Sequence, residues 1–500
     1  MSPLDSPPIS SFAFDNTYAR ELEGLYVPWQ ATQAPQPALV KLNRELAKEL
    51  GLAAEALDAT AAAQLFSGNR LPPGTATIAQ AYAGHQFGGF SPQLGDGRAL
   101  LLGEVIDQHG RRRDIAFKGS GRTPFSRGGD GKAALGPVLR EYLIGEAMHA
   151  LGIPTTRALA AVTTGEVVRR ERNLPGAVLT RVAASHIRVG TFQFVTAHGD
   201  EALLRRLADY VIKRHYPELD GQDYLGLLQA VCERQAALIA RWMLAGFIHG
   251  VMNTDNMTLS GETIDYGPCA FMDRYDPATV FSSIDERGRY AYANQPPIAG
   301  WNLTRLAETL LPLLGEDQDR AAAQALEVLG TFQDRYQHHW LQGMRRKLGL
   351  AQDAADDLAL ATDFLETMQG QGVDYTQAFR RLADAAAHTG PAADAGLRKL
   401  YAVDAALNAW LPRWRARLQT EPGDPAQRAR AMRAVNPVYI PRNHKVEEAL
   451  NAAVEHGNYA PFENLLAVLQ RPFDELKDLA AYAEPAPAHE SAHYQTFCGT

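Results

Sequence analysis

The spacing of apolar residues along the chain changes character near residue 200. Before this point, from about 76 to 195, glycine-rich stretches separate short apolar runs, a pattern typical of strands and turns. Residues 99–106 and 114–118 are predicted to be strands, and 139–151 is predicted to be a helix. We interpret this part of the chain as a small lobe of mixed α and β structure.

From about residue 201 onward, apolar residues recur at the spacing of an α-helix. One long helix is predicted from a single apolar stripe, which consists of Leu225, Leu228, Cys232, Ile239, Met243 and Phe247. Further helices rich in Ala and Leu are expected over 302–348 and 355–483. A shorter helical pattern is visible earlier in the chain, where leucines at 39, 42, 46 and 50 predict a helix over 39–50.

A chain of 500 residues is longer than one hydrophobic core usually organises. We therefore divide it into four parts: an N-terminal arm packed on the core (1–75), a mixed α/β lobe (76–200), a helical lobe (201–348), and a C-terminal helical region with a flexible tail (349–500).

The charge balance argues against nucleic acid as the main partner. Lys and Arg total 49 against 57 Asp and Glu, which gives a formal charge of -8, and the longest basic tract is Arg111–Arg113. No run approaches the roughly 20 apolar residues of a membrane span, and the first residues lack the pattern of a signal peptide. We expect a cytoplasmic protein with neither nucleic acid nor membrane as a partner. Three cysteines are too few for a disulfide framework.

Two features with chemical potential lie in the first lobe. Gly95 and Gly97 form a turn before the first predicted strand, and glycine lets backbone approach a nucleotide closely, although a plain hairpin turn has the same pattern. The second predicted strand ends in Lys118. Kinases use a strand lysine to hold ATP phosphates, and a glutamate on the next helix, here Glu141, fixes its position. Exposed Lys and Glu are common, so this pair alone does not decide the function.

Two further features follow the long helix. Residues 249–257 read HGVMNTDNM, and the sequence Asp-Tyr-Gly begins at Asp265, nine residues after Asn256. In kinases an Asn and a later Asp in this arrangement hold magnesium through oxygen atoms. The kinase base would fall on Val251, which cannot accept a proton, so ordinary kinase chemistry is not favoured. Asp255 is the nearest carboxylate that could act as a base instead.

In this order the motifs resemble selenoprotein O, a family of pseudokinase-fold protein adenylyltransferases called YdiU in bacteria. The resemblance covers nearly the whole chain and rests on these segments: Phe14-Asp15-Asn16, YAGHQFG at 82–88, QLGDGR at 93–98, KGSG at 118–121, MNTDNM at 252–257, DYGP at 265–268, and the segment 436–444. It implies an α+β, bilobal protein-kinase-like fold with an N-terminal arm and a C-terminal helical extension.

The resemblance also implies an activity. ATP would bind inverted relative to active kinases, so that AMP passes to Ser, Thr or Tyr hydroxyls of proteins and pyrophosphate leaves. Nucleotide contacts are implied for Gly95, Gly97, Arg98, Lys118, Asp130, Gly131, Arg181 and Arg188. Asn256 and Asp265 would hold Mg²⁺, or Mn²⁺ in its place, Asp255 would be the base, and Glu141 would support Lys118. ATP is then a substrate, and the partners are proteins that carry hydroxyl groups.

Some members of the family carry a selenocysteine close to the C-terminus, and Cys498 stands at the similar position here. We hypothesise that Cys498 pairs with Cys269 as a redox switch, and two unpaired thiols are the alternative. Two alternatives for the function also stay open. One is an atypical phosphotransferase that uses Asp255, and the other is a nucleotide-sensing pseudokinase scaffold without catalysis.

Overall fold

The computed structural model describes residues 12–497 except 54, 56, 389 and 492–493. Its described part contains an eight-stranded sheet in which neighbouring strands pair antiparallel, in the order β1-β3-β6-β7-β10-β9-β2, with β8 beside β10. The strands are β1 (Tyr26–Pro28), β2 (Ala38–Leu42), β3 (Ile78–Gln80), β6 (Ala99–Ile106), β7 (Arg112–Lys118), β8 (Ala133–Ala134), β9 (Arg157–Arg169) and β10 (Asn173–Ala183). The chain is therefore of mixed α and β structure, and its N-terminal part supplies the two edge strands, β1 and β2.

The strand predicted at 99–106 is confirmed by β6, and the strand at 114–118 forms the second part of β7. The predicted helix at 139–151 is α4 (Leu135–Ala150), which begins four residues earlier. The helix predicted over 39–50 is wrong. Its first residues form β2, which pairs with β9, and Asn43 then caps the short helix α2 (Arg44–Glu49) by accepting a hydrogen bond from the backbone of Leu46 at 3.1 Å.

Two apolar clusters cover the two faces of the sheet. On one face, residues of α2 and α3 (Ala59–Phe66) pack against Ile115 and Phe117 of β7. On the other face, a larger cluster joins Ala116 of β7 to α4 and continues into the helical part of the chain. Successive residues of β7 therefore point to opposite faces, as expected for a strand.

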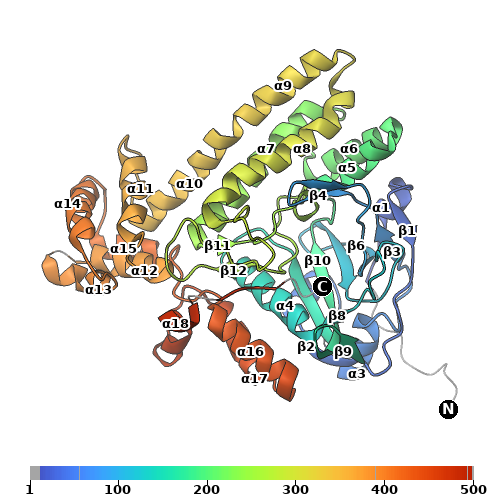
Figure 1. Cartoon of the computed structure of the whole chain (residues 1–500), viewed down its shortest axis with the longest axis horizontal. Coiled ribbons are helices and arrows are strands. Elements are labelled where there is room, and N and C mark those ends of the chain that lie inside the picture. The colour runs from blue at the N-terminus through green and yellow to red at the C-terminus, as the bar shows by residue number, and fades with distance from the viewer. Residues whose placement is uncertain (1–11, 54, 56, 389, 492–493, 498–500) are drawn as a thin grey trace.

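The helical part confirms the long predicted helix as α7 (Tyr224–Ala245), which packs against α8 and α10. In Figure 1 these helices run side by side away from the sheet. The elements here are α5 (Val189–His198), α6 (Glu201–His215), α8 (Gln295–Leu314), α9 (Gln318–Gly330) and α10 (Phe332–Leu348), with short strands β11 (Phe247–Ile248) and β12 (Ala270–Phe271). No helix in the described residues is both long and apolar enough to cross a membrane.

The C-terminal helices form two groups in Figure 1, one at the far end of the molecule and one below α4. The first group is α11 (Asp357–Met368), α12 (Tyr375–Ala386), α13 (Ala395–Arg398), α14 (Ala405–Gln419) and α15 (Pro425–Arg433). The second group contains α16 (Asn443–His456), α17 (Ala460–Leu469) and the short α18 (Ala488–Ser491). Both α16 and α17 pack against α4, where the ring of Phe462 meets that of Tyr142 edge-on at 5.8 Å. The C-terminal chain thus returns to the helix that carries Glu141.

A buried arginine ties these helices to the rest of the molecule. The side chain of Arg442 is 0% exposed, and its Nη1 lies 2.6 Å from Oδ1 of Asp273 and 2.7 Å from Oδ2 of Asp374. Asp374 also caps α12, because its side chain accepts a hydrogen bond from the backbone N–H of Gln377 at 2.7 Å. The segment 436–444 therefore has a structural role.

We expect Arg442→Ala to lower the free energy of unfolding by about 3–5 kcal/mol, because it leaves two buried carboxylates without a counter-charge. The measurement is denaturant or thermal unfolding of the full chain. Arg413→Ala is the matched control, since Arg413 pairs with Asp363 at a solvent-exposed position and its loss should cost below about 1 kcal/mol. Equal losses of unfolding free energy in Arg442→Ala and Arg413→Ala would contradict the structural role of Arg442.

Candidate active site

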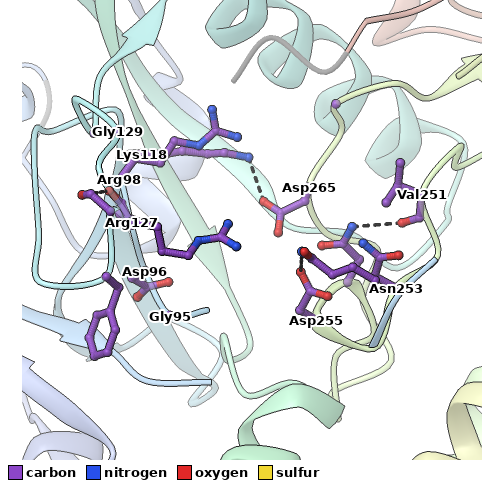
Figure 2. Close-up of a pocket in the computed structure, with 18 of the residues that line it drawn as sticks. Gly95, Asp96, Arg98, Lys118, Arg127, Gly129, Val251, Asn253, Asp255 and Asp265 are labelled. Carbon is purple, nitrogen blue, oxygen red and sulfur yellow. Dashed lines mark hydrogen bonds and ion pairs between the residues drawn. The ribbon is translucent and has the colours of Figure 1, made fainter. Parts of the chain in front are cut away.

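A cleft of about 620 Å³ opens between the sheet and the helical part of the chain. Figure 2 shows Gly95, Arg98 and Lys118 on the sheet side, facing Val251, Asn253, Asp255 and Asp265 on the other. The predicted site residues that line this cleft are Gly95, Gly97, Arg98, Lys118, Asp130, Gly131, Arg181, Arg188, Asp255, Asn256 and Asp265. The fold therefore brings together residues that are up to 170 positions apart in the sequence.

Lys118 reaches the cleft because of its register in β7. It shares a face of the strand with Ala116, so its side chain points towards α4 and away from α2 and α3. There its Nζ lies 2.6 Å from Oε2 of Glu141 and 2.7 Å from Oδ1 of Asp265. The pair of Lys118 and Glu141 is thus present, and Lys118 also bridges to the far side of the cleft (Figure 2).

The carboxylate of Asp265 meets three cations. Besides Lys118, Arg181 Nη1 lies 2.7 Å from Oδ1 and Arg188 Nη1 lies 2.9 Å from Oδ2. Burial alone would raise the pKa of Asp265, but the cations outweigh burial and hold its pKa well below the usual value. The residue adopts a left-handed backbone conformation with φ of 63°, which is uncommon for a residue other than glycine. We infer that backbone strain accompanies this placement of the carboxylate.

Hydrogen bonds to Glu141 and His186 fix the position of the Arg181 side chain. Its Nη1 donates to Oε1 of Glu141 at 3.2 Å, and its Nε donates to Nε2 of His186 at 3.2 Å. Since arginine can only donate, Nε2 of His186 must be the acceptor, and its proton resides on Nδ1. Nδ1 lies 3.0 Å from Oδ2 of Asp114. Burial lowers the pKa of His186, which favours this neutral form.

Arg188 precedes α5, and its guanidinium lies over an aromatic ring. Its guanidinium stands 4.5 Å from the ring centre of Tyr82, and its Nη1 donates to the backbone oxygen of Asp255 at 2.8 Å. Arg188 therefore connects the Asp265 carboxylate to the turn that carries Asp255.

Asp255 and Asn256 lie in the 3₁₀ turn Thr254–Asn256. Asp255 is only 8% exposed, and its Oδ2 accepts a hydrogen bond from Gln86 Nε2 at 3.3 Å. Among the described residues its other oxygen, Oδ1, is buried without a hydrogen-bond partner. Burial raises the pKa of Asp255 to about 6, against the opposing effect of Arg188. The group is then ionised at neutral pH and still basic enough to accept a proton.

Asn256 and Asp265 offer the oxygen ligands that a divalent cation prefers. Nδ2 of Asn256 donates to the backbone oxygen of Val251 at 2.9 Å, which leaves the side-chain oxygen as the atom for a metal. The described residues hold no cluster of three or more His, Cys, Asp or Glu side chains that could form a complete cage. Two oxygen donors fit magnesium, which usually completes its coordination with phosphates and waters.

The glycines of the cleft are required where backbone segments cross. A Cβ on Gly95, whose φ is +74°, would lie 2.4 Å from the ring of Phe125. A Cβ on Gly131, whose φ is +69°, would lie 2.2 Å from the backbone oxygen of Gly121. Gly95 therefore lets the turn at 94–98 lie against Phe125 of the loop 119–132, and Gly131 lets two parts of that loop lie against each other.

Comparison with known proteins agrees with this site. Residues 8–470 match the family model of the protein adenylyltransferase SelO. The chain is 63% identical over 493 residues to a protein nucleotidyltransferase YdiU of Cereibacter sphaeroides, covering 98% of this chain and 100% of the relative. It is 60% identical over 495 residues to a protein of the same name from Rhizobium etli, covering 99% and 98%. The chain belongs to the SelO family of protein adenylyltransferases. The resemblance found in the sequence is thereby confirmed, and this chain is an enzyme of the nucleotidyltransferase class.

The sequence analysis gave no role to several residues of the cleft. Arg170 and Lys132 line it, and Arg170 holds Asp130 through two contacts of 2.8 and 3.0 Å. Arg170 follows β9 in a charged hairpin, Arg169 to Arg172, and this cluster of charge between two strands is the only signal it leaves in the sequence. Gln86 lies within the motif at 82–88 that supported the resemblance, but it had no assigned role.

The cysteine hypothesis can be followed only in part. Cys269 is buried, and burial raises the pKa of its thiol to about 11. Cys498 lies outside the described residues. The last described part of the tail does approach Cys269, because Oγ1 of Thr496 donates to the backbone oxygen of Pro268 at 2.6 Å. This contact places Thr496 against the loop that follows Asp265.

Proposed function

We propose that this chain transfers AMP from ATP to Ser, Thr or Tyr hydroxyls of proteins and releases pyrophosphate. The observation that carries the proposal is the cluster of Lys118, Arg181 and Arg188 around Asp265, with the carboxylate of Asp255 beside it and Val251 in the place of a kinase base. The cations suit a polyphosphate, because arginine and lysine bind phosphate oxygens through charge-assisted hydrogen bonds.

In the proposed reaction Lys118, Arg181 and Arg188 bind the phosphates of ATP, and the glycine loops at 95–97 and 131 pack along the nucleotide. Asn256 and Asp265 would hold Mg²⁺ or Mn²⁺, which neutralises phosphate charge when bound. Asp255 accepts the proton of the acceptor hydroxyl. The hydroxyl oxygen then forms a bond to the α-phosphorus, and the bond from that phosphorus to the β-phosphate oxygen breaks, so that pyrophosphate leaves.

We also propose that the fold is bilobal and protein-kinase-like. An antiparallel sheet whose lysine pairs with a glutamate of α4 suits a kinase N-lobe, and the helical part with Asn256 and Asp265 suits a C-lobe. The proposed boundaries are 1–75 for the arm, 76–200 and 201–348 for the lobes, and 349–500 for the C-terminal extension.

Mass spectrometry of acceptor proteins after incubation with ATP and Mg²⁺ tests the function. Addition of an AMP group supports it. Addition of phosphate would identify a phosphotransferase, and the absence of any covalent change would identify a nucleotide-sensing scaffold.

Substitution of Asp265 and substitution of Asp255 should impair different steps of the reaction. Asp265→Ala is expected to abolish binding of ATP with its metal, because it removes the group that gathers the cations and a metal ligand. Asp255→Ala should keep ATP binding and slow AMP transfer by about 10²–10⁴-fold, the usual contribution of a general base. ATP affinity by calorimetry and transfer rate with labelled ATP are measured on both, with Asp319→Ala on the exposed face of α9 as the control. Equal losses of ATP affinity in both variants would contradict the role of Asp255.

We further propose that Cys269 and Cys498 form a reversible disulfide, in which an external oxidant takes two electrons and two protons from the thiols. The bridge would fasten the tail to the loop after Asp265 and so change nucleotide access. We expect the ATP affinity of the wild-type chain to differ between oxidising and reducing buffers, and this difference to vanish in Cys498→Ser. Cys232→Ser, which changes a buried thiol of α7, is the control. Identical affinities of the wild-type chain in both buffers would exclude the switch.

A further inference from the structure

Exposed apolar side chains stand at the rim of the cleft above Asp255. Phe87 is 38% exposed and Ile284 is 51% exposed, and both line the same cleft as Asp255. We call Phe87 and Ile284 the cleft rim.

Phe87 is held in a conformation that does not suit its side chain. It is the first residue of the two-residue turn between β4 (Gly84–Gln86) and β5 (Gly89–Ser91), where Gln86 pairs with Gly89. Phe87 has φ of 51° and Gly88 has φ of 89°, as in a type I′ turn. Such turns favour Asn or Gly at the first position, and a bulky residue with positive φ is strained. The turn does not explain an aromatic ring here, and Phe87 is 38% exposed, so part of the ring is available to a partner molecule.

The turn is fastened to the loop that carries Asp255. The backbone N–H of Phe87 donates to Oδ1 of Asn253 at 3.0 Å, and the hydroxyl of Tyr290 donates to the same oxygen at 2.7 Å. The ring of Phe87 lies 5.1 Å from that of Tyr290. The neighbouring Gln86 donates to Asp255 itself. Phe87 is therefore placed at a fixed position relative to the proposed base.

Behind the turn lies a cation that complements a negative charge. A Cβ on Gly88 would stand 3.7 Å from the guanidinium carbon of Arg289. Arg289 lies over the ring of Trp301 at 4.9 Å, and it has no ion pair with a carboxylate in the described part of the chain. Its Nε is also buried there without a hydrogen-bond partner.

The position of Asp255 limits what can occupy this surface. Because Asp255 is only 8% exposed, an acceptor hydroxyl reaches it only if its own chain enters the cleft past the rim. We propose that the rim and Arg289 bind an extended segment of the acceptor protein. This segment would carry a large apolar residue within a few positions of the modified hydroxyl, and an acidic residue further along the segment. This inference rests on the proposed function and adds the acceptor class to it.

The test uses peptide libraries with one fixed Ser, Thr or Tyr and mixed residues at the flanking positions, incubated with the full chain, labelled ATP and Mg²⁺. The wild-type chain should select Phe, Leu, Ile or Met near the hydroxyl, together with Asp or Glu. Phe87→Asn should lose the apolar preference and raise the KM for a selected peptide by about tenfold, as for one lost apolar contact. Because Asn suits this turn, the variant should melt no lower than the wild-type chain. Arg289→Gln should lose only the acidic preference.

Val403→Asn is the matched control, since Val403 is 62% exposed in a loop before α14, in the C-terminal helical group. Its peptide preferences should equal those of the wild-type chain. ATP affinity is measured on each variant. If ATP affinity falls in Phe87→Asn by as much as peptide modification does, the inference is overturned. An unchanged apolar preference in Phe87→Asn would also overturn it, as would AMP transfer to folded proteins but to no peptide. If neither proteins nor peptides receive AMP, the proposed function itself is wrong.

Discussion

The site depends on one carboxylate that three cations share. Asp265 lies within 2.9 Å of nitrogen atoms from Lys118, Arg181 and Arg188, which come from β7, from β10 and from the segment before α5. Glu141 pairs with Lys118 and Arg181, and the carboxylate of Asp255 acts on Arg188. Buried cations and carboxylates therefore compensate one another in this cluster, and removal of one partner would leave a costly unpaired charge. The same contacts hold the two sides of the cleft together.

This cluster is kept in place by groups that never reach the cleft. Glu141 orients Lys118 and Arg181, while Asp114 and His186 orient Arg181 from the opposite side. Asp114 is itself paired with Arg214 of α6 at 2.5 Å. The helix of Glu141 packs against the sheet and also against α16 and α17. The C-terminal helices therefore contribute to the position of the lysine, although none of their described residues lines the cleft.

The spacing of apolar residues correctly predicted the helices and strands that are defined by their own sequence. The stripe that defines α7 and the apolar run of β6 are of this kind. The leucines at 39, 42, 46 and 50 misled, because a strand and a helix joined at Asn43 carry apolar residues at the same spacing. Arg181 and Arg188 have no local signal at all, since their role comes from strand register and a tertiary contact, and only the family resemblance pointed to them. The contact of Arg170 with Asp130 is likewise set by the hairpin between β9 and β10.

The positions of Asp255 and of the cleft rim both follow from the close approach of the β4–β5 hairpin to the turn Thr254–Asn256. A Cβ on Gly84 would lie 2.6 Å from Oδ1 of Asp255, so only glycine lets the hairpin of β4 and β5 lie against this turn. That approach buries Asp255 and raises its pKa, and it also carries Phe87 to the mouth of the cleft. In a kinase arrangement the base would stand at position 251, where this chain has a valine that is 7% exposed. With the proposed base at 255, proton transfer would depend on the hairpin, and the acceptor would approach along the hairpin as well.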